Sequence, residues 1–197
     1  GLLNTDATQY ESETLLSDLL DAINEGANDQ RIKILVLDLD SLQGATLAQV
    51  SDLGDALDAF KAAGKTVYAW GGGYTQSQYF LAAYADKIFV NDTSLQVFGG
   101  VFMTGFGVYP TFYKEALDKL KVTMHVFKVG TYKGAVEPFL RDNMSIESKE
   151  ANLGWLTVLW DNYAKTITDK RGISRTEFDQ YISEYDTLLA EAAGDAS

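Results

Sequence analysis

The chain has 197 residues, of which 46% are hydrophobic and 22% charged, so it is long enough to bury a core and too apolar to be disordered. Its net charge of −12 argues against binding to nucleic acid or anionic lipid, because the mean field repels phosphate groups. The absence of cysteine excludes disulfides, thiolate metal sites and a cysteine nucleophile.

The first half of the chain alternates between segments with helix-like and strand-like patterns. Apolar residues at helical spacing predict three helices, over residues 11–26, 46–63 and 75–84. Branched apolar runs predict three strands, over residues 32–40, 66–70 and 87–90. The run 32–40 is almost continuously apolar, so we expect a central strand covered on both faces. The alternation predicts an α/β fold with a parallel sheet.

The second half begins with glycines spaced among aromatic residues, over residues 94–109. This pattern indicates either short irregular strands or plain core packing. The following elements are a helix over residues 110–120, a strand over 122–129, and helices that begin after Ser145 and Ser174.

Lys133 lies between two glycines and near apolar residues, directly after the predicted strand. To act as a general base at neutral pH, a lysine must have its pKa lowered by roughly 3 units, or about 4 kcal/mol. Burial against Tyr132, Val136 and Phe139, and a helix that begins near Tyr132, would both lower it. A neutral lysine can take the proton from a serine hydroxyl. On the residues alone, an ordinary exposed lysine remains the alternative.

The run of residues 126–145 closely resembles the lysine-bearing segment of the signal peptide peptidase A family, without gaps. Three further stretches, residues 34–39, 64–70 and 78–88, are similar to the amino-terminal domain of that family. The resemblance extends from about residue 15 to about residue 171. It implies that Lys133 is the general base of a Ser-Lys dyad.

The resemblance also implies a Clp-protease/crotonase-like fold, a superhelical stack of β-β-α units. The chain opens on Gly1 and holds neither a signal peptide nor an apolar run near the roughly 18 residues of a membrane span. We therefore expect residues 1–197 to be a single domain from a larger two-domain protease, with residues 145–197 as a helical extension. The resemblance places that protease in the bacterial cell envelope, anchored in the inner membrane by a segment outside this chain, with the domain on the periplasmic side.

The expected partners follow from the same resemblance. They are cleaved signal peptides or other hydrophobic, extended peptides as substrates, a downstream domain that carries the catalytic serine, and further copies of the protein in a homo-oligomeric ring. In the resembled family the region of residues 94–109 helps to shape the peptide groove and the oligomer contacts. No cofactor and no metal ion is expected.

The turn of residues 71–73 bears on the nucleophile. In the carboxy-terminal domain of the resembled family, this turn carries the serine as Ser-Gly-Gly-Tyr, and aligning that tyrosine with Tyr79 places Gln76 at the serine position. An amide cannot attack a peptide carbonyl, so we expect this chain to supply the base and to be inactive when isolated. Ser77, one residue away, is the rival nucleophile. Gln76 also occupies the place of the third glycine of a dinucleotide-binding motif, which argues against nucleotide binding.

Other polar residues have plainer interpretations. His125, the chain's single histidine, falls on one face of a predicted strand and is expected to be structural. Asp38 and Asp40 are two residues apart and would share a strand face, either as ligands or as solvated strand ends that cap the next loop. Glu137 and Asp142 are expected to shape the loop after Lys133 or to pair with nearby cations.

Two other functions remain open at this point. One is a non-catalytic scaffold that only builds the ring and its groove. The other is a crotonase-like enzyme that acts on acyl-coenzyme A, against which the acidic charge and the lysine segment both argue.

Overall fold

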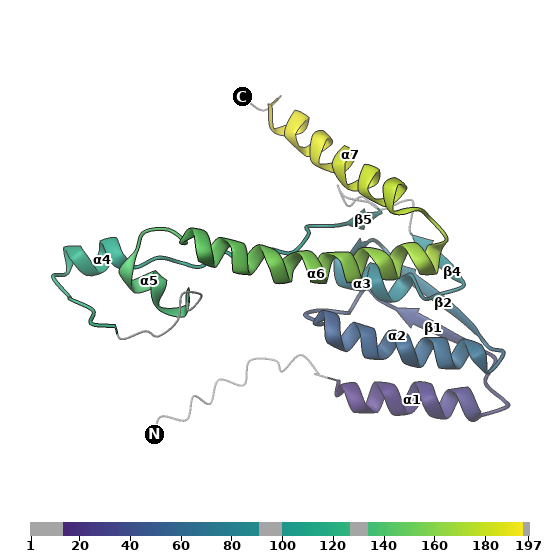
Figure 1. Ribbon diagram of the computed structural model, residues 1–197. Helices are drawn as coiled ribbons and strands as arrows, with labels where there is room; N and C mark the ends of the chain where they lie inside the picture. The colour runs from purple at the N-terminus through teal and green to yellow at the C-terminus, as the bar shows by residue number, and fades with distance from the viewer. Residues whose placement is uncertain (1–13, 91–99, 127–133, 195–197) are drawn as a thin grey trace, which may run out of the picture. The chain divides into compact units, whose positions relative to one another are not determined.

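The computed structural model describes residues 14–90, 100–126 and 134–194 (Figure 1). The chain divides into two compact units, one of Gly1–Met103 with Lys170–Gly172, and one of Thr104–Asp169 with Ile173–Ser197. That the chain forms a single domain stays a prediction. Within the described ranges, no helix is both long and apolar enough to cross a membrane.

The first unit contains all the strands that the structure describes. Its elements in chain order are α1 (Leu16–Asn28), β1 (Ile34–Asp38), α2 (Leu47–Ala62), β2 (Thr66–Gly71), β3 (Tyr74–Thr75), α3 (Gln76–Ala82), β4 (Lys87–Val90) and β5 (Val101–Phe102). Strands β1, β2 and β4 form a parallel sheet in the order β1-β2-β4, and β3 pairs in parallel with β5. The predicted α/β fold with a parallel sheet is confirmed, whereas the superhelical stack of β-β-α units stays a prediction.

Helices α1 and α2 pack on each other and on one face of this sheet (Figure 1). Helix α2 begins with a capping box between Thr46 and Gln49, and it buries the apolar stripe that its spacing predicts. The stripe consists of Val50, Leu53, Leu57 and Phe60. The observed bounds of α2 thus differ by one residue at each end from the predicted range 46–63.

The other face of the sheet is exposed, which corrects the prediction for residues 32–40. Ile34 and Val36 of β1 are 50% and 60% exposed, and Trp70 and Phe89 on the same face are also exposed. Among the described strands, β1 lies at the edge of the sheet and β2 at its centre. The nearly continuous apolar run therefore does not mark a strand that is buried on both faces.

The second unit is helical, with α4 (Lys114–Lys119), the 3₁₀ turn η1 (Gly134–Val136), α5 (Glu137–Leu140), α6 (Ile146–Arg171) and α7 (Arg175–Gly194). Rings from three segments pack together in this unit: Phe106, Trp160, Tyr163 and Phe178. Ser145 caps α6 and Ser174 pairs with Glu177 before α7, as predicted.

Two other predictions for this part of the chain are wrong in detail. Helix α4 begins at Lys114 rather than near residue 110. Residues 122–126 adopt no strand, and the rest of the predicted strand lies outside the described residues. In the glycine-rich stretch, only Val101–Phe102 forms a strand among the residues that the structure describes.

Candidate functional site

Lys133 lies outside the described residues, so its position and surroundings stay predictions. Gly134, the next residue, begins the 3₁₀ turn η1 that leads into α5. Of the apolar residues expected to bury the lysine, Val136 is half-buried, whereas Phe139 is 39% exposed and stacks on Tyr113 at 5.8 Å between ring centroids. Phe139 thus packs on Tyr113, and its expected contact with Lys133 stays a prediction.

A buried carboxylate organises the segment that follows Lys133. Glu137 is only 5% exposed, and its Oε2 accepts a hydrogen bond of 3.0 Å from the backbone N–H of Ser145. Its Oε1 accepts a second, short hydrogen bond from the Ser145 hydroxyl. That hydroxyl oxygen in turn accepts from the backbone N–H of Ser148, 3.1 Å away. The prediction that Glu137 shapes this loop is confirmed.

The charge of Glu137 is stabilised in place. Burial raises the pKa of this carboxyl. Hydrogen bonds from Ser145 and Ser148 and the charge of Arg141 lower the pKa by more than burial raises it, so the pKa lies below its ordinary value. The carboxylate also stands at the amino-terminal end of the 26-residue helix α6, where the helix dipole favours negative charge. Glu137 is therefore an ionised, buried acceptor rather than a proton donor.

Gly134 approaches the same network closely. A Cβ atom at this position would overlap the Ser148 hydroxyl and stand 3.4 Å from Ser148 Cβ. Ser148 is itself buried and hydrogen-bonds the Glu137 carboxylate through its side chain. A side chain at residue 134, which is next to Lys133 in the chain, would therefore displace the Ser148 hydroxyl.

A small pocket of about 280 Å³ adjoins these residues within the second unit. Most of its lining is apolar, and Glu137, Ser148 and Asn152 are the polar exceptions. The apolar lining residues include Val108, Pro110, Phe112, Ala135, Pro138 and Met144.

In the first unit, the turn after β2 is held by backbone and side-chain hydrogen bonds. The N–H of Gly72 donates to Asp40 Oδ1 at 2.7 Å. The buried Gln78 amide donates to the carbonyls of Leu39 and Leu42, at 2.7 and 3.2 Å. Sequence reasoning gave Gln78 no role, although its place three residues after Thr75 matches the capping box that the structure contains.

The two candidates for the nucleophile position both lie at the beginning of α3. Gln76 is the first residue of this helix, and Ser77 donates its hydroxyl hydrogen to the carbonyl of Ala45 at 3.3 Å. The structure leaves the rival Ser77–Lys133 pair untested, because the lysine lies outside the described residues.

Asp38 and Asp40 do not share a strand face, because β1 ends at Asp38. Asp38 accepts from the Asp40 N–H at 3.3 Å, and Asp40 binds the Gly72 turn, so both cap the loop after the strand. His125 is exposed and lies outside any strand, which corrects the expectation of a structural histidine on a strand face. Within the described ranges, no group of three or more His, Cys, Asp or Glu residues is arranged to hold a metal ion.

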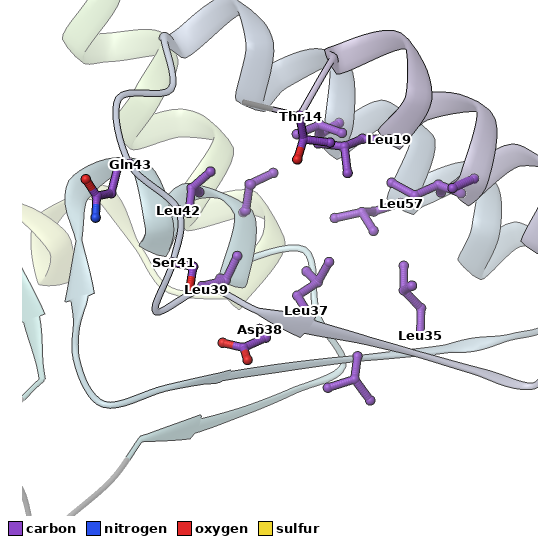
Figure 2. A pocket seen from close by; sticks show the side chains of 15 residues that line it. Thr14, Leu19, Leu35, Leu37, Asp38, Leu39, Ser41, Leu42, Gln43 and Leu57 are labelled. Atoms are coloured by element: carbon purple, nitrogen blue, oxygen red, sulfur yellow. The ribbon is translucent and has the colours of Figure 1, made fainter. Parts of the chain in front are cut away.

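A larger cavity of about 810 Å³ lies between α1, α2 and β1 in the first unit (Figure 2). Figure 2 shows Leu35 and Leu37 of β1 pointing toward Leu19 and Leu57 of the helices. Among its described lining residues only Asp38 is charged. Most of the lining of this cavity is apolar.

One known protein family matches most of the chain. Residues 59–196 match peptidase family S49, a range that includes the turn after β2 and everything described around Glu137. The chain belongs to peptidase family S49. The expected membership of the signal peptide peptidase A family is thereby confirmed, and the crotonase-like alternative loses its support.

Relatives of this S49 chain are known from bacteria and from a plant. It is 42% identical to Protease 4 of Haemophilus influenzae over 175 residues, which cover 87% of the chain and 28% of that relative. It is 44% identical to Protease 4 of Salmonella typhi, over 82% of the chain and 25% of the relative. The chloroplastic serine protease SPPA of Arabidopsis thaliana is 22% identical over 90% of the chain and 25% of its own length. The chain thus spans about a quarter of the length of these relatives.

Proposed function

We propose that this chain is the part of an S49 serine endopeptidase that supplies the general base of a Ser-Lys dyad. The observation that carries the proposal is the segment Gly130 to Phe139, in which Lys133 stands between two glycines, inside a match to peptidase family S49. Lys133 takes the proton from a serine hydroxyl as the serine attacks the peptide carbonyl, and then gives that proton to the leaving amine.

The nucleophile belongs, in this proposal, to a second domain. Gln76 stands where the resembled turn has its serine, and the relatives are more than three times as long as the chain. A split dyad of this kind leaves the isolated chain without peptidase activity. Activity from the purified chain would contradict the split arrangement.

The proposed substrates are cleaved signal peptides and similar hydrophobic, extended peptides. The apolar pocket of about 280 Å³ beside Gly134 supports this proposal, because it offers an apolar side chain a place one residue away from Lys133 in the chain. An extended peptide would add strand-like backbone pairing to such a contact. We further propose that the complete protein is a homo-oligomeric ring, anchored in the bacterial inner membrane with this part on the periplasmic side.

The deciding experiment is peptide cleavage by the complete protein with Lys133→Ala, compared with wild type. We expect kcat to fall by about 10²–10⁴-fold while assembly is unchanged, because the base acts in the chemical step. Lys149→Ala is the matched control, since Lys149 is an exposed lysine of the same region. If Lys133→Ala keeps wild-type activity, the chain is a non-catalytic scaffold whose lysine segment serves structure.

A further inference from the structure

The buried carboxylate of Glu137 does more than the loop needs for stability. Ser145 already caps α6 through its own hydroxyl, which accepts from the N–H of Ser148. An uncompensated buried charge is costly, so a carboxylate in this place requires the three hydrogen-bonding groups that it receives. A neutral side chain would close the loop without that requirement.

The carboxylate joins two parts of the chain. One part is the end of η1 and the start of α5, and the other is the first turn of α6, eight residues further along. Both oxygens of Glu137 are used by Ser145, and the Ser148 side chain binds the same group. These contacts hold the carboxylate in one orientation. They therefore also restrain the backbone at residue 137.

The close approach of Gly134 to Ser148 extends this constraint toward the lysine. Gly134 lies against the side chain that also hydrogen-bonds Glu137, and its ideal Cβ position is 3.9 Å from Glu137 Cδ. The short turn Gly134–Val136 is thereby held at both of its ends. One peptide bond separates it from Lys133.

We propose that Glu137 is a positioning residue for the proposed base: it locks the turn Gly134–Val136, which directly follows Lys133 in the chain, onto the first turn of α6. This inference rests on the proposed function. It assigns Glu137 no contact with substrate, and it makes Gly134, Ser145 and Ser148 parts of one rigid support for the lysine. A base held in this way loses little freedom on reaching the reactive geometry.

The test compares Glu137→Ala and Glu137→Gln in the complete protein by steady-state peptide cleavage. We expect kcat to fall about 10- to 100-fold in Glu137→Ala with KM within twofold, because a misplaced base slows the chemical step and leaves peptide binding intact. Glu137→Gln keeps the shape and an oxygen acceptor, so it should recover most of that loss. Glu147→Ala removes an exposed carboxylate from the same helix turn and should leave kcat unchanged.

A readout independent of activity is amide hydrogen exchange. In Glu137→Ala, the amides of Gly134–Val136 and of Ser148 should exchange at least tenfold faster, while the far end of α6 keeps its wild-type rates. If Glu137→Ala does not fold, Ser148→Ala removes one hydrogen bond to the carboxylate and keeps the Ser145 cap. That variant should give a smaller loss of kcat, about 3- to 10-fold, again without a change in KM.

The outcomes separate the two proposals. Suppose that Lys133→Ala abolishes cleavage. The base assignment then stands, but the positioning role is wrong if Glu137→Ala keeps kcat within twofold of wild type. The positioning role is also wrong if Glu137→Gln is as impaired as Glu137→Ala. If Lys133→Ala is fully active, the proposed function fails, and the positioning role fails with it even where hydrogen exchange shows that Glu137 holds the turn.

Discussion

Gly54 in helix α2 lies so close to Tyr84 that a Cβ atom at residue 54 would stand 2.7 Å from the tyrosine hydroxyl oxygen. The Tyr84 ring is buried, and its centroid is 5.8 Å from that of Phe80. The ammonium of Lys170 stands 4.5 Å from the same ring and pairs with Asp58, one helical turn after Gly54. A glycine inside this helix is therefore explained by the packing of one aromatic ring.

Replacing Gly54 with alanine should destabilise the protein although alanine is the better helix former. The new methyl group forces a buried ring to move, and overpacking of this kind costs about 1–3 kcal/mol of unfolding free energy. Denaturant unfolding at constant m-value measures the change. The matched control is Gly154→Ala in α6, at an exposed site with nothing within 4 Å, which should gain up to about 1 kcal/mol. Changes of the same sign in both variants would contradict this explanation.

Gln78→Ala should lower the unfolding free energy by about 1–3 kcal/mol, because it leaves the carbonyls of Leu39 and Leu42 without the amide that they bind. Gln49 occupies the same third position of the capping box in α2, but it is exposed. Gln49→Ala should therefore cost no more than a surface cap, at most about 1 kcal/mol. The urea midpoints of the two variants compare their losses of unfolding free energy. Equal losses in Gln78→Ala and Gln49→Ala would show that the buried amide contributes nothing beyond the cap.

Stability should decline between pH 10 and pH 12. Burial, and then the charges of Asp58 and Asp55, raise the pKa of Tyr84 to about 12. An unfolded tyrosine ionises near pH 10, so the contribution of the neutral phenol is intact below pH 10 and is lost as the pH rises toward 12. Tyr84→Phe cannot ionise and should show a shallower decline over this window.

The measurement is the melting temperature of each variant as a function of pH from 8 to 12. Tyr109→Phe is the control, because Tyr109 is 93% exposed and its replacement should leave the melting temperature unchanged. If the melting temperature of Tyr84→Phe declines as steeply as that of wild type, other groups cause the alkaline sensitivity. Tyr74 is then the first candidate, because burial and the charge of Asp40 raise its pKa to about 12 as well.

Ser77→Ala should keep at least half of the wild-type peptidase activity of the complete protein. The Ser77 hydroxyl donates to the carbonyl of Ala45, and its loss removes one partly buried hydrogen bond. The variant should therefore lose no more than about 1 kcal/mol of stability and little activity. The assay is the one used for Lys133→Ala. A loss as large as that caused by Lys133→Ala would make Ser77 the nucleophile and would end the split-dyad proposal.

Helices were predictable where their signals lie within a few residues of each other. The apolar stripe of residues 46–63 predicts α2 to within one residue at each end, and the structure adds a capping box of Thr46 and Gln49 at its start. Strands were harder, because a strand is defined by a partner that is distant in sequence. Residues 122–126 have the composition of a strand but lie outside any sheet in the described structure, and the apolar residues of β1 face solvent on one side.

The amino-acid sequence alone was sufficient for the family and the parallel α/β class, and the proposal for Lys133 rests on it as well, since each depends on patterns carried by contiguous residues. The roles of Glu137 and Gly54 required the folded chain. Glu137 meets Ser145 across eight residues and Gly54 meets Tyr84 across thirty, and in neither pair do the two residues belong to the same helix or strand. Such contacts exist only after the chain has reversed direction, so the packing of whole elements decides them and local pattern does not.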